Sequence, residues 1–353
     1  MCEDFTLEAY RYELPLHLIA QEPAAKRDEA RLMIVSKTEG KIIAEDKVKN
    51  IASYLPANAV LVFNEVKVIP ARVYAHKATG GRVEILLLRF LAANTAEVLL
   101  KANKPIKADE KIFVEIDGKQ REIVVKSAPL EGGKRIIEAR NFCLDESTLE
   151  KIGLPPLPPY IKRTYDDPRL TLDKQRYQTV FATRGEAVAA PTAALHFTDA
   201  LLKELEAKFT VLKVLLNVGL GTFQPVRKRN IREHKMHAET YEIPKNAAQK
   251  IKIAKKQKRP IIAIGTTTVR ALETAALDNF SEKSLKNTSE LFIYPGFNFR
   301  IVDGVMTNFH LPGSTLIMMI AAFVGRKEIL GIYEKAVEKN YRFYSYGDAM
   351  LII

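Results

Sequence analysis

The stretch Ile261-Ile-Ala-Ile-Gly-Thr-Thr-Thr-Val-Arg270 decides the fold class. Its first four residues form a short apolar run, which is typical of a buried strand. Gly265 and the threonines after it predict a tight turn, and the apolar residues from Ala271 to Leu277 predict a helix. A strand, a short turn and a helix in this order are typical of a parallel sheet covered by helices.

The same pattern extends on the N-terminal side of this stretch. Thr198 can cap a helix that runs to Lys208, because its side chain can accept a backbone N–H of the first turn. A buried strand is predicted at residues 211–218, and Pro244 suits the first turn of the helix that follows. Near the start of the chain, residues 59–63 are all apolar and predict another buried strand, which ends at Asn64.

Residues 71–150 have a different character. Strand-like runs rich in β-branched residues are separated by glycine-containing turns, and Asp117-Gly118 between two such runs indicates a hairpin. The cluster of prolines at residues 155–159 can continue neither a helix nor a central strand, so it marks the exit from this segment. The predicted fold class is therefore α/β, with a mixed-sheet α/β domain (residues 1–70 and 151–353) and an inserted small antiparallel β-barrel domain (residues 71–150).

Composition restricts the function classes. The chain has 353 residues, of which 47% are hydrophobic and 27% are charged, as in a globular protein with a sizeable core. No apolar run reaches the roughly 20 residues of a membrane span, and the acidic start of the chain lacks the features of a signal peptide. Cys2 and Cys143 offer neither a disulfide framework nor a thiolate zinc site. We expect a cytoplasmic protein that contacts no membrane.

The positive charge suggests a polyanionic partner. The net charge is +12, and twelve lysines and arginines lie between Pro225 and Pro260 against Glu233, Glu239 and Glu242. Nucleic-acid contact and a solvated helix face both explain such a segment.

Two glycine-containing stretches are candidates for ligand loops. Gly219-Leu-Gly-Thr-Phe223 follows a predicted strand, but it lacks the third glycine of the dinucleotide fingerprint and can also be a plain tight turn. At Gly265-Thr-Thr-Thr-Val-Arg270, hydroxyls and free N–H groups at a helix start can hold a carboxylate or phosphate, which Arg270 can bind bidentately. A capped helix start without a ligand is the alternative reading.

Histidines beside hydroxyl-bearing residues are candidates for proton transfer. His196 and His310 lie in Ala190-Pro-Thr-Ala-Ala-Leu-His-Phe-Thr198 and Thr307-Asn-Phe-His-Leu-Pro-Gly-Ser-Thr315, and imidazole titrates near neutrality. Each can equally be a hydrogen-bonded core histidine. His234 and His237 have no carboxylate at ligand spacing, so an RNA contact is favoured over a metal. The motifs of common hydrolases, ATPases and zinc proteases are absent from the sequence.

Together the motifs resemble the S-adenosylmethionine:tRNA ribosyltransferase-isomerase family of queuosine biosynthesis. The matching stretches keep the family's order along almost the whole chain. They include Tyr12-Glu-Leu-Pro15, Val68-Ile-Pro-Ala-Arg72, Leu157-Pro-Pro-Tyr-Ile-Lys-Arg163, Leu195-His-Phe-Thr198, Val218-Gly-Leu-Gly-Thr-Phe-Gln-Pro225, Glu233-His-Lys-Met-His237, Thr307-Asn-Phe-His-Leu-Pro312 and Tyr341-Arg-Phe-Tyr-Ser-Tyr-Gly-Asp-Ala-Met350.

The resemblance implies a reaction. The ribosyl group of S-adenosylmethionine would be transferred and isomerised onto 7-aminomethyl-7-deazaguanine at the tRNA wobble position, giving epoxyqueuosine-tRNA with release of adenine and methionine. It implies no metal and no cofactor beyond S-adenosylmethionine as substrate, and it implies the same fold, an α/β domain with an inserted barrel. We expect a monomer.

The resemblance also suggests roles for residues. Those for catalysis are His196, His310 and Asp348, the last as an orienting carboxylate. Those for substrate binding are Thr192, Gly219, Gly221, Thr222, Gln224, Thr266, Thr267, Arg270 and Asn308. Those for tRNA binding are Arg227, Lys228, Arg229, His234, Lys235 and His237.

The chain departs from the family pattern at a few positions. Asn217 stands where a histidine is usual, Ala194 replaces a glycine, and Gly313 replaces a basic or polar residue. Two other readings remain open. An S-adenosylmethionine-dependent tRNA methyltransferase would share both substrates, and a non-catalytic RNA-binding protein would explain the basic segment alone.

Overall fold

The computed structural model describes residues 3–219 and 226–353. Three residues predicted to bind substrate, Gly221, Thr222 and Gln224, lie outside the described residues. The chain forms two compact units. The α/β unit comprises Met1–Lys67, Gln178–Gly185 and Ala190–Ile353, and the barrel unit comprises Val68–Tyr177 and Glu186–Ala189.

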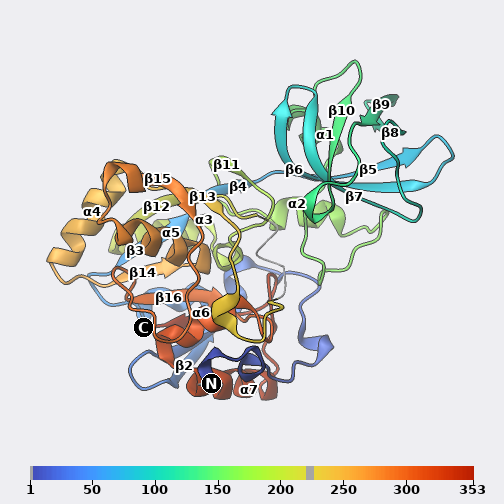
Figure 1. Cartoon of the computed structure of the whole chain (residues 1–353). Coiled ribbons are helices and arrows are strands. Elements are labelled where there is room, and N and C mark those ends of the chain that lie inside the picture. Colours follow the sequence, from blue (N-terminus) through green and yellow to red (C-terminus); the bar gives the residue numbers. More distant parts are fainter. Residues whose placement is uncertain (1–2, 220–225) are drawn as a thin grey trace. The chain divides into compact units, whose positions relative to one another are not determined.

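A nine-stranded mixed sheet forms the centre of the α/β unit (Figure 1), in the order β15-β13-β12-β3-β14-β16-β17-β1-β2. The neighbours β12, β3, β14 and β16 are parallel to one another, and β17 is antiparallel to β16 but parallel to β1. The strands are β1 (Arg31–Ser36), β2 (Lys41–Lys47), β3 (Val60–Asn64), β12 (Thr210–Leu216), β13 (Glu239–Glu242), β14 (Ile261–Ile264), β15 (Lys286–Ser289), β16 (Gly304–Asn308) and β17 (Ala349–Ile352).

The core of this unit lies against the sheet. Every residue of β3 is buried, and the ring of Phe63 packs edge-on against Phe197 with 5.0 Å between centroids. Leu201 and Leu205 of the first long helix join the same cluster, whereas alternate residues of β3 face the other side of the sheet. The helices are α3 (Asp199–Lys208), α4 (Lys245–Lys256), α5 (Thr266–Leu277), α6 (Thr315–Val324) and α7 (Arg326–Glu338), with short 3-10 turns that include η7 (Thr192–His196) and η9 (Ile231–Glu233).

The barrel unit contains a closed antiparallel barrel in the order β10-β7-β6-β5-β8-β9. Asp117 and Gly118 turn between β8 and β9 with φ of 51° and 71°, which confirms the predicted hairpin. The elements are β5 (Arg72–Lys77), β6 (Arg82–Ala92), β7 (Thr95–Ala102), β8 (Lys111–Ile116), β9 (Lys119–Val125), β10 (Lys134–Ala139), α1 (Glu146–Ile152) and α2 (Leu170–Arg176); β4 (Val66–Val68) and β11 (Arg184–Ala187) pair where the chain passes between the units.

The segment after the barrel packs with it. Leu154 and Arg72 exchange two backbone hydrogen bonds, and the Arg72 guanidinium donates to the carbonyl of Leu157 at 2.8 Å. Residues 151–177 therefore lie in the compact unit of the barrel, whereas the sequence assigned them to the α/β domain. Leu154, just before the proline cluster, pairs with the backbone of β5, and the carbonyl of Leu157 within the cluster accepts from the Arg72 side chain; composition does not show these contacts.

The predicted fold class is confirmed, together with most of its elements. Thr198 caps α3 by accepting the N–H of Leu201, as predicted. The helix predicted from Ala271 begins earlier, at Thr266. The hydroxyl of Thr268 donates to the carbonyl of Ile264, the last residue of β14. Among the described residues, no helix is long and apolar enough to cross a membrane.

Candidate functional site at the sheet edge

Predicted site residues gather at one edge of the nine-stranded sheet. Because β12, β3, β14 and β16 are parallel, their carboxyl ends meet there. Ala349 of the antiparallel β17 pairs with Asn308, the last residue of β16, so the start of β17 lies at the same edge. Ligands of open α/β sheets bind outside the carboxyl ends of strands. This edge is the candidate site.

His196 is connected to β16 through Asn308. The Asn308 side-chain Nδ2 donates to the imidazole Nε2 of His196 at 3.0 Å, and the Thr192 hydroxyl donates to Asn308 Oδ1 at 2.8 Å. Asn308 Nδ2 also donates to the backbone carbonyl of Asp348 at 3.4 Å. All of these groups except Thr192 are almost fully buried. The four residues form one hydrogen-bonded cluster, the His196 cluster.

This geometry decides which nitrogen of His196 carries a proton. The Asp348 carbonyl can only accept, so the amide nitrogen of Asn308 faces it. The same nitrogen can only donate, so His196 Nε2 must accept and the neutral imidazole carries its proton on Nδ1. Proton uptake on Nε2 would require the Asn308 amide to rotate.

His310 lies in a buried setting beyond the end of β16. Its Nε2 is 2.8 Å from the Thr307 hydroxyl, its backbone N–H donates to the Tyr333 hydroxyl, and its carbonyl accepts from the Tyr12 hydroxyl at 2.5 Å. Burial lowers the pKa of His310 from 6.5 to about 3, and it raises the pKa of both phenols. His310 is therefore a neutral hydrogen-bonding ring at neutral pH.

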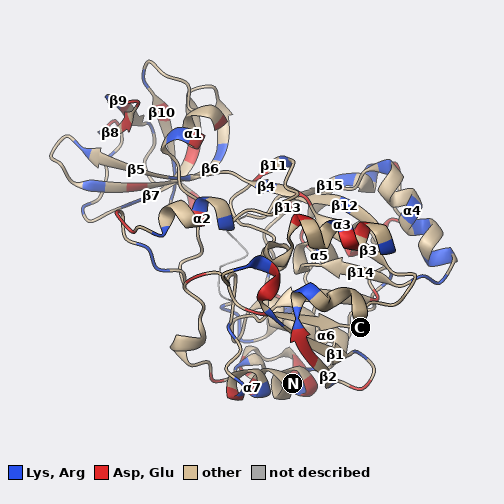
Figure 2. Ribbon diagram, turned by 180° about the vertical axis from the view of Figure 1, so that it is seen from behind, with Lys and Arg blue, Asp and Glu red and all other residues tan. Residues whose placement is uncertain are grey.

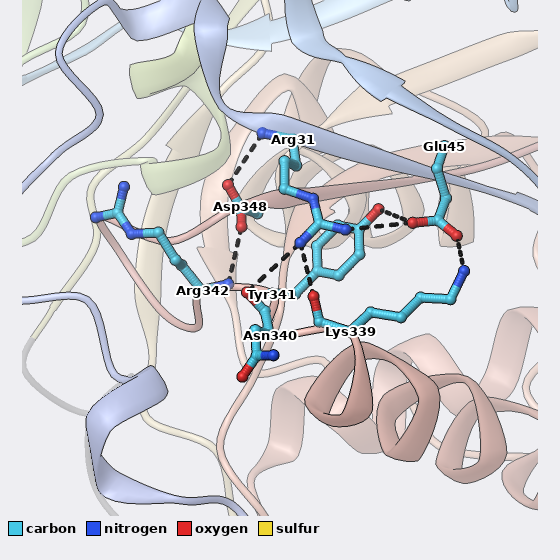
Figure 3. A network of polar contacts seen from close by, with 7 residues as sticks. All are labelled: Arg31, Glu45, Lys339, Asn340, Tyr341, Arg342 and Asp348. Carbon is cyan, nitrogen blue, oxygen red and sulfur yellow. Dashed lines mark hydrogen bonds and ion pairs between the residues drawn. The ribbon is translucent and has the colours of Figure 1, made fainter.

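The carboxylate of Asp348 holds the backbone of two other residues in place. One carboxylate oxygen accepts the N–H of Arg31 at 3.0 Å and the other accepts the N–H of Arg342 at 2.8 Å (Figure 3). Burial raises the pKa of this carboxyl. Only its main-chain carbonyl reaches the His196 cluster, through Asn308. The structure thus connects Asp348 to His196 indirectly.

A charged network on the β1 side supports the turn between Arg342 and Asp348, which precedes β17. The Arg31 guanidinium lies 3.6 Å above the Tyr341 ring and contacts Glu45, which also accepts from Tyr341 and Lys339 (Figure 3). The turn itself requires Gly347, because a Cβ there would lie 2.4 Å from the carbonyl oxygen of Arg342. The strand starts around the His196 cluster are therefore held rigidly.

The start of α5 provides hydroxyls at the same edge. Thr266 and Thr267 are the first two residues of the helix, whose first N–H groups have no partner within it. The side chain of Asn64, at the end of β3, donates to Thr267 at 3.3 Å and also pairs with both backbone groups of Leu216. Asn64 thus connects the ends of β3 and β12 to the helix start.

Arg270 is engaged within the protein. Its buried guanidinium forms an ion pair with Glu239 and donates to the carbonyls of Leu291 and Ser289 at 3.2 Å. Glu239 in turn accepts the backbone N–H of Gly219 at 2.9 Å. The predicted bidentate binding of a ligand carboxylate by Arg270 would therefore require the release of Glu239.

The basic segment divides into two parts. Lysines of α4 line that helix (Figure 2), and Lys255 pairs with Asp303. The other part, residues 226–237, surrounds η9. Here Arg227, Lys228, Arg229, Lys235 and His237 are exposed, whereas His234 is half-buried.

Two hollows contain none of the predicted site residues. One, of about 670 Å³, lies in the barrel unit beside Tyr74, Arg82 and Tyr165. The other, of about 320 Å³, is lined by Asn217, whose side chain donates to the Thr240 hydroxyl at 3.0 Å. The described ranges contain no group of three or more side chains placed to hold a metal.

Sequence reasoning missed several residues of this edge. Glu239, Asn64, Tyr12 and Tyr333 were not predicted to take part. A polar residue at the end of a wholly apolar run signalled Asn64, and the Tyr12-Glu-Leu-Pro motif contained Tyr12. Nothing in the sequence pairs Glu239 with Arg270, because their contact depends on the order of β12 and β13.

Comparisons with known proteins agree on one family. A family model described as "Queuosine biosynthesis protein" matches residues 7–352. The chain is 44% identical to a protein of Fusobacterium nucleatum and 46% identical to one of Carboxydothermus hydrogenoformans, both named S-adenosylmethionine:tRNA ribosyltransferase-isomerase. The matches cover 98% of this chain and 96% and 99% of those proteins.

A solved structure is also similar. The crystal structure of S-adenosylmethionine tRNA ribosyltransferase from Thermotoga maritima has a TM-score of 0.53 and 32% sequence identity to this chain. The likeness covers 98% of this chain and 100% of that one. Sequence and fold thus lead to the same group of proteins.

Proposed function

Because the chain belongs to the family of queuosine biosynthesis proteins, we propose that it is an enzyme that transfers and isomerises the ribosyl group of S-adenosylmethionine onto tRNA. The acceptor is 7-aminomethyl-7-deazaguanine at the wobble position, and the products are epoxyqueuosine-tRNA, adenine and methionine. One observation carries the proposal. The His196 cluster and the start of α5 lie at the same sheet edge, in a chain that matches the family from residue 7 to 352.

The reaction needs a base, an acid and a dry site. The positive sulfur acidifies the 5′ protons of the ribosyl group, so a base removes one and adenine departs. The aminomethyl nitrogen of the modified base then adds to the unsaturated sugar, and the carbanion formed beside sulfur closes the carbocycle on the sugar aldehyde. The resulting alkoxide displaces methionine as a neutral thioether and forms the epoxide. Proton transfers of this kind proceed best in a site that excludes water.

His196 transfers the proton. Its Nε2 is occupied by Asn308, so rotation of the Asn308 amide accompanies proton uptake there. After rotation, Asn308 Oδ1 accepts from the imidazolium and Nδ2 donates to the Thr192 hydroxyl, while the hydrogen bond from Asn308 to the Asp348 carbonyl is broken. Before proton uptake, Asp348 orients this cluster through that backbone carbonyl.

His310 acts as a neutral partner. Its pKa of about 3 makes it a weak base at neutral pH, but a neutral imidazole can donate or accept a hydrogen bond beside the reacting sugar. Tyr12 and Tyr333 hold its backbone on both sides. His310 thus assists the proton transfer without taking the charge.

The rest of the substrate binds around the helix start. Thr266 and Thr267 hold the methionine carboxylate with the N–H groups of α5, and Arg270 positions Glu239 and Gly219 behind them. Gly219 borders the ribose and adenine; the same role is proposed for Gly221, Thr222 and Gln224 from the family motif alone, because they lie outside the described residues. Asn308 and Thr192 contact the ribosyl hydroxyls.

The polyanionic substrate binds the segment around η9. The residues that contact tRNA are Arg227, Lys228, Arg229, His234, Lys235 and His237. The wobble base sits in a loop, so splaying it into the site costs little. We place the protein in the cytoplasm as a monomer that needs no cofactor beyond S-adenosylmethionine.

Product analysis tests the proposal. Purified protein is incubated with S-adenosylmethionine and tRNA carrying the aminomethyl base, and small products are separated by chromatography. Adenine and methionine released only with that tRNA support ribosyl transfer. S-adenosylhomocysteine would indicate the methyltransferase, and tRNA binding without turnover would indicate a non-catalytic RNA-binding protein.

A further inference from the structure

A continuous row of four half-buried rings runs beside the basic residues of η9. The ring centroids are 6.2 Å apart for Phe5 and Tyr294, 5.1 Å for Tyr294 and Phe292, and 5.4 Å for Phe292 and His234. The guanidinium carbon of Arg232 lies 4.4 Å from the centre of the Phe5 ring and extends the row at one end. We call Phe5, Tyr294, Phe292 and His234 the aromatic row.

The row is held in place by backbone contacts. Leu7 donates its N–H to the carbonyl of Arg229 at 2.9 Å, and Thr6 forms a β-bridge with Asn230, so the N-terminal segment lies along the basic one. Asn230 caps η9, and Ile231 is fully buried beneath it. The surface is therefore preformed.

The rings of the aromatic row are partly exposed to solvent, whereas other aromatic side chains of this protein are fully buried in its core. Phe63, Phe197 and Phe309 are fully buried. In the segment 292–294, by contrast, only Ile293 is fully buried, while Phe292 and Tyr294 on either side stay half-exposed. Aromatic faces left partly open next to cations are typical of surfaces on which bases stack.

The cations near the row are not neutralised. Arg227, Lys228, Arg229, Arg232 and Lys235 are all exposed, and Glu233 is the acidic residue among them. Within the described ranges, none of these five forms an ion pair with a carboxylate. Arg326, by contrast, is paired with Glu3 and Asp4, the two residues before Phe5. Unpaired positive charge beside open rings complements a phosphate backbone with unpaired bases.

We propose that the aromatic row is a stacking platform for unpaired bases of the tRNA anticodon loop, while the five cations bind the adjoining phosphates. The inference rests on the proposed function, because it takes tRNA as the partner. A single-stranded loop fits better than a duplex, since only unpaired bases present their faces for stacking. Burial, and then the charge of His237, lower the pKa of His234, so its ring is neutral and stacks as the other rings do.

Removing single rings tests the platform. Phe292→Leu, Tyr294→Leu and Phe5→Leu keep apolar volume but lose the aromatic face. Binding is measured with a fluorescent stem-loop RNA that carries the anticodon loop, and with a fully paired duplex of the same length. Phe297→Leu is the matched control, because Phe297 is also half-buried but packs on Phe299 outside the row.

We expect each row variant to bind the stem-loop roughly 5- to 100-fold more weakly than the parent. Duplex binding and the salt dependence should stay unchanged, because stacking releases no counterions. Phe292→Tyr should restore binding, which separates a stacking role from a purely structural one. The Phe297 control should match the parent.

Other outcomes overturn the inference. They are parent-like binding of the stem-loop by the row variants, equal weakening on the duplex, or a change in oligomeric state instead of RNA affinity. The proposed reaction fails separately. If binding depends on the aromatic row but no adenine is released, the platform is supported and the reaction is rejected. If adenine is released normally and the row variants bind RNA as the parent does, the reaction is supported and the platform is rejected. A parent that binds no RNA rejects both.

Discussion

At the residue scale, the buried imidazole of His310 makes folding stability depend on pH. Its pKa is about 3 in the folded protein and returns to 6.5 on exposure. Between these values the unfolded chain binds the extra proton. The contribution of His310 to the free energy of unfolding is therefore fully present above about pH 6.5. It is lost as the pH falls toward 3, at roughly 1.4 kcal/mol per pH unit.

We expect His310→Gln to remove this loss. Between about pH 7.5 and about pH 5.5, the free energy of unfolding in urea should fall by about 1.4 kcal/mol more in the parent than in the variant. His17→Gln is the control, because His17 is exposed and should leave the parent's dependence intact. Identical pH dependence in the parent and the His310 variant would contradict a buried neutral ring.

Asn308 allows a second residue-scale prediction. Asn308→Leu removes the donor to His196 and leaves the volume similar. We expect kcat to fall roughly 10- to 100-fold and KM for S-adenosylmethionine to rise by a smaller factor, because Asn308 also contacts the ribosyl hydroxyls but orientation of an acid–base group matters most in the transition state. Thr192→Val keeps the contact between Asn308 and His196 and should lose less. Unchanged kcat in Asn308→Leu would reject the role of His196.

At the element scale, the turn before β17 depends on one glycine. A Cβ on Gly347 would overlap Arg342 and Phe343 backbone atoms at 2.4 Å and 2.5 Å. We expect Gly347→Ala to lower the free energy of unfolding by about 2–4 kcal/mol, since backbone cannot yield cheaply. Gly331→Ala in α7 meets no atom within 4 Å and should instead raise stability by about 0.5–1 kcal/mol. Thermal unfolding of both variants checks the contrast.

The two parts of the basic segment differ in their expected contact with tRNA. Replacing Arg227, Lys228 and Arg229 with Ala should weaken tRNA binding and reduce the slope of log affinity against log salt by about one per lost phosphate contact. Replacing Lys250, Lys252 and Lys256 of α4 removes the same charge elsewhere and should change the slope less. Equal slopes for both triple variants would mean that net charge alone attracts tRNA.

Elements were predictable where hydrophobic spacing is regular, and the site was predictable only in part. The strands β3 and β14 and the helix α3 follow from their apolar runs. The start of α5 does not, because three threonines after a glycine resemble a turn, whereas in the structure they are buried in the first turn of the helix. The sequence motifs identified His196, His310 and Asn308 as site residues. The contact between His196 and Asn308 could not be predicted, because it forms only when β16 and η7 are brought together in the fold.

At the scale of the whole molecule, each compact unit has a core of its own. We expect calorimetry to resolve two unfolding transitions, because separate cores unfold independently. Leu61→Ala should lower one transition and Val98→Ala in the barrel the other, since both side chains are fully buried. If both variants shift a single common transition, the units unfold as one cooperative body.

The mixed order of the sheet has a consequence for synthesis of the chain. Strand β1 pairs with β17, which is made about 300 residues later, so at roughly 5–20 residues per second β1 waits some 15 to 60 seconds for its partner on the ribosome. Its four apolar residues, Leu32 to Val35, all end up buried, and the strand meanwhile has an open edge that can pair wrongly. A protein that holds nascent chains should therefore raise the yield of this enzyme, and it should act before β17 is translated.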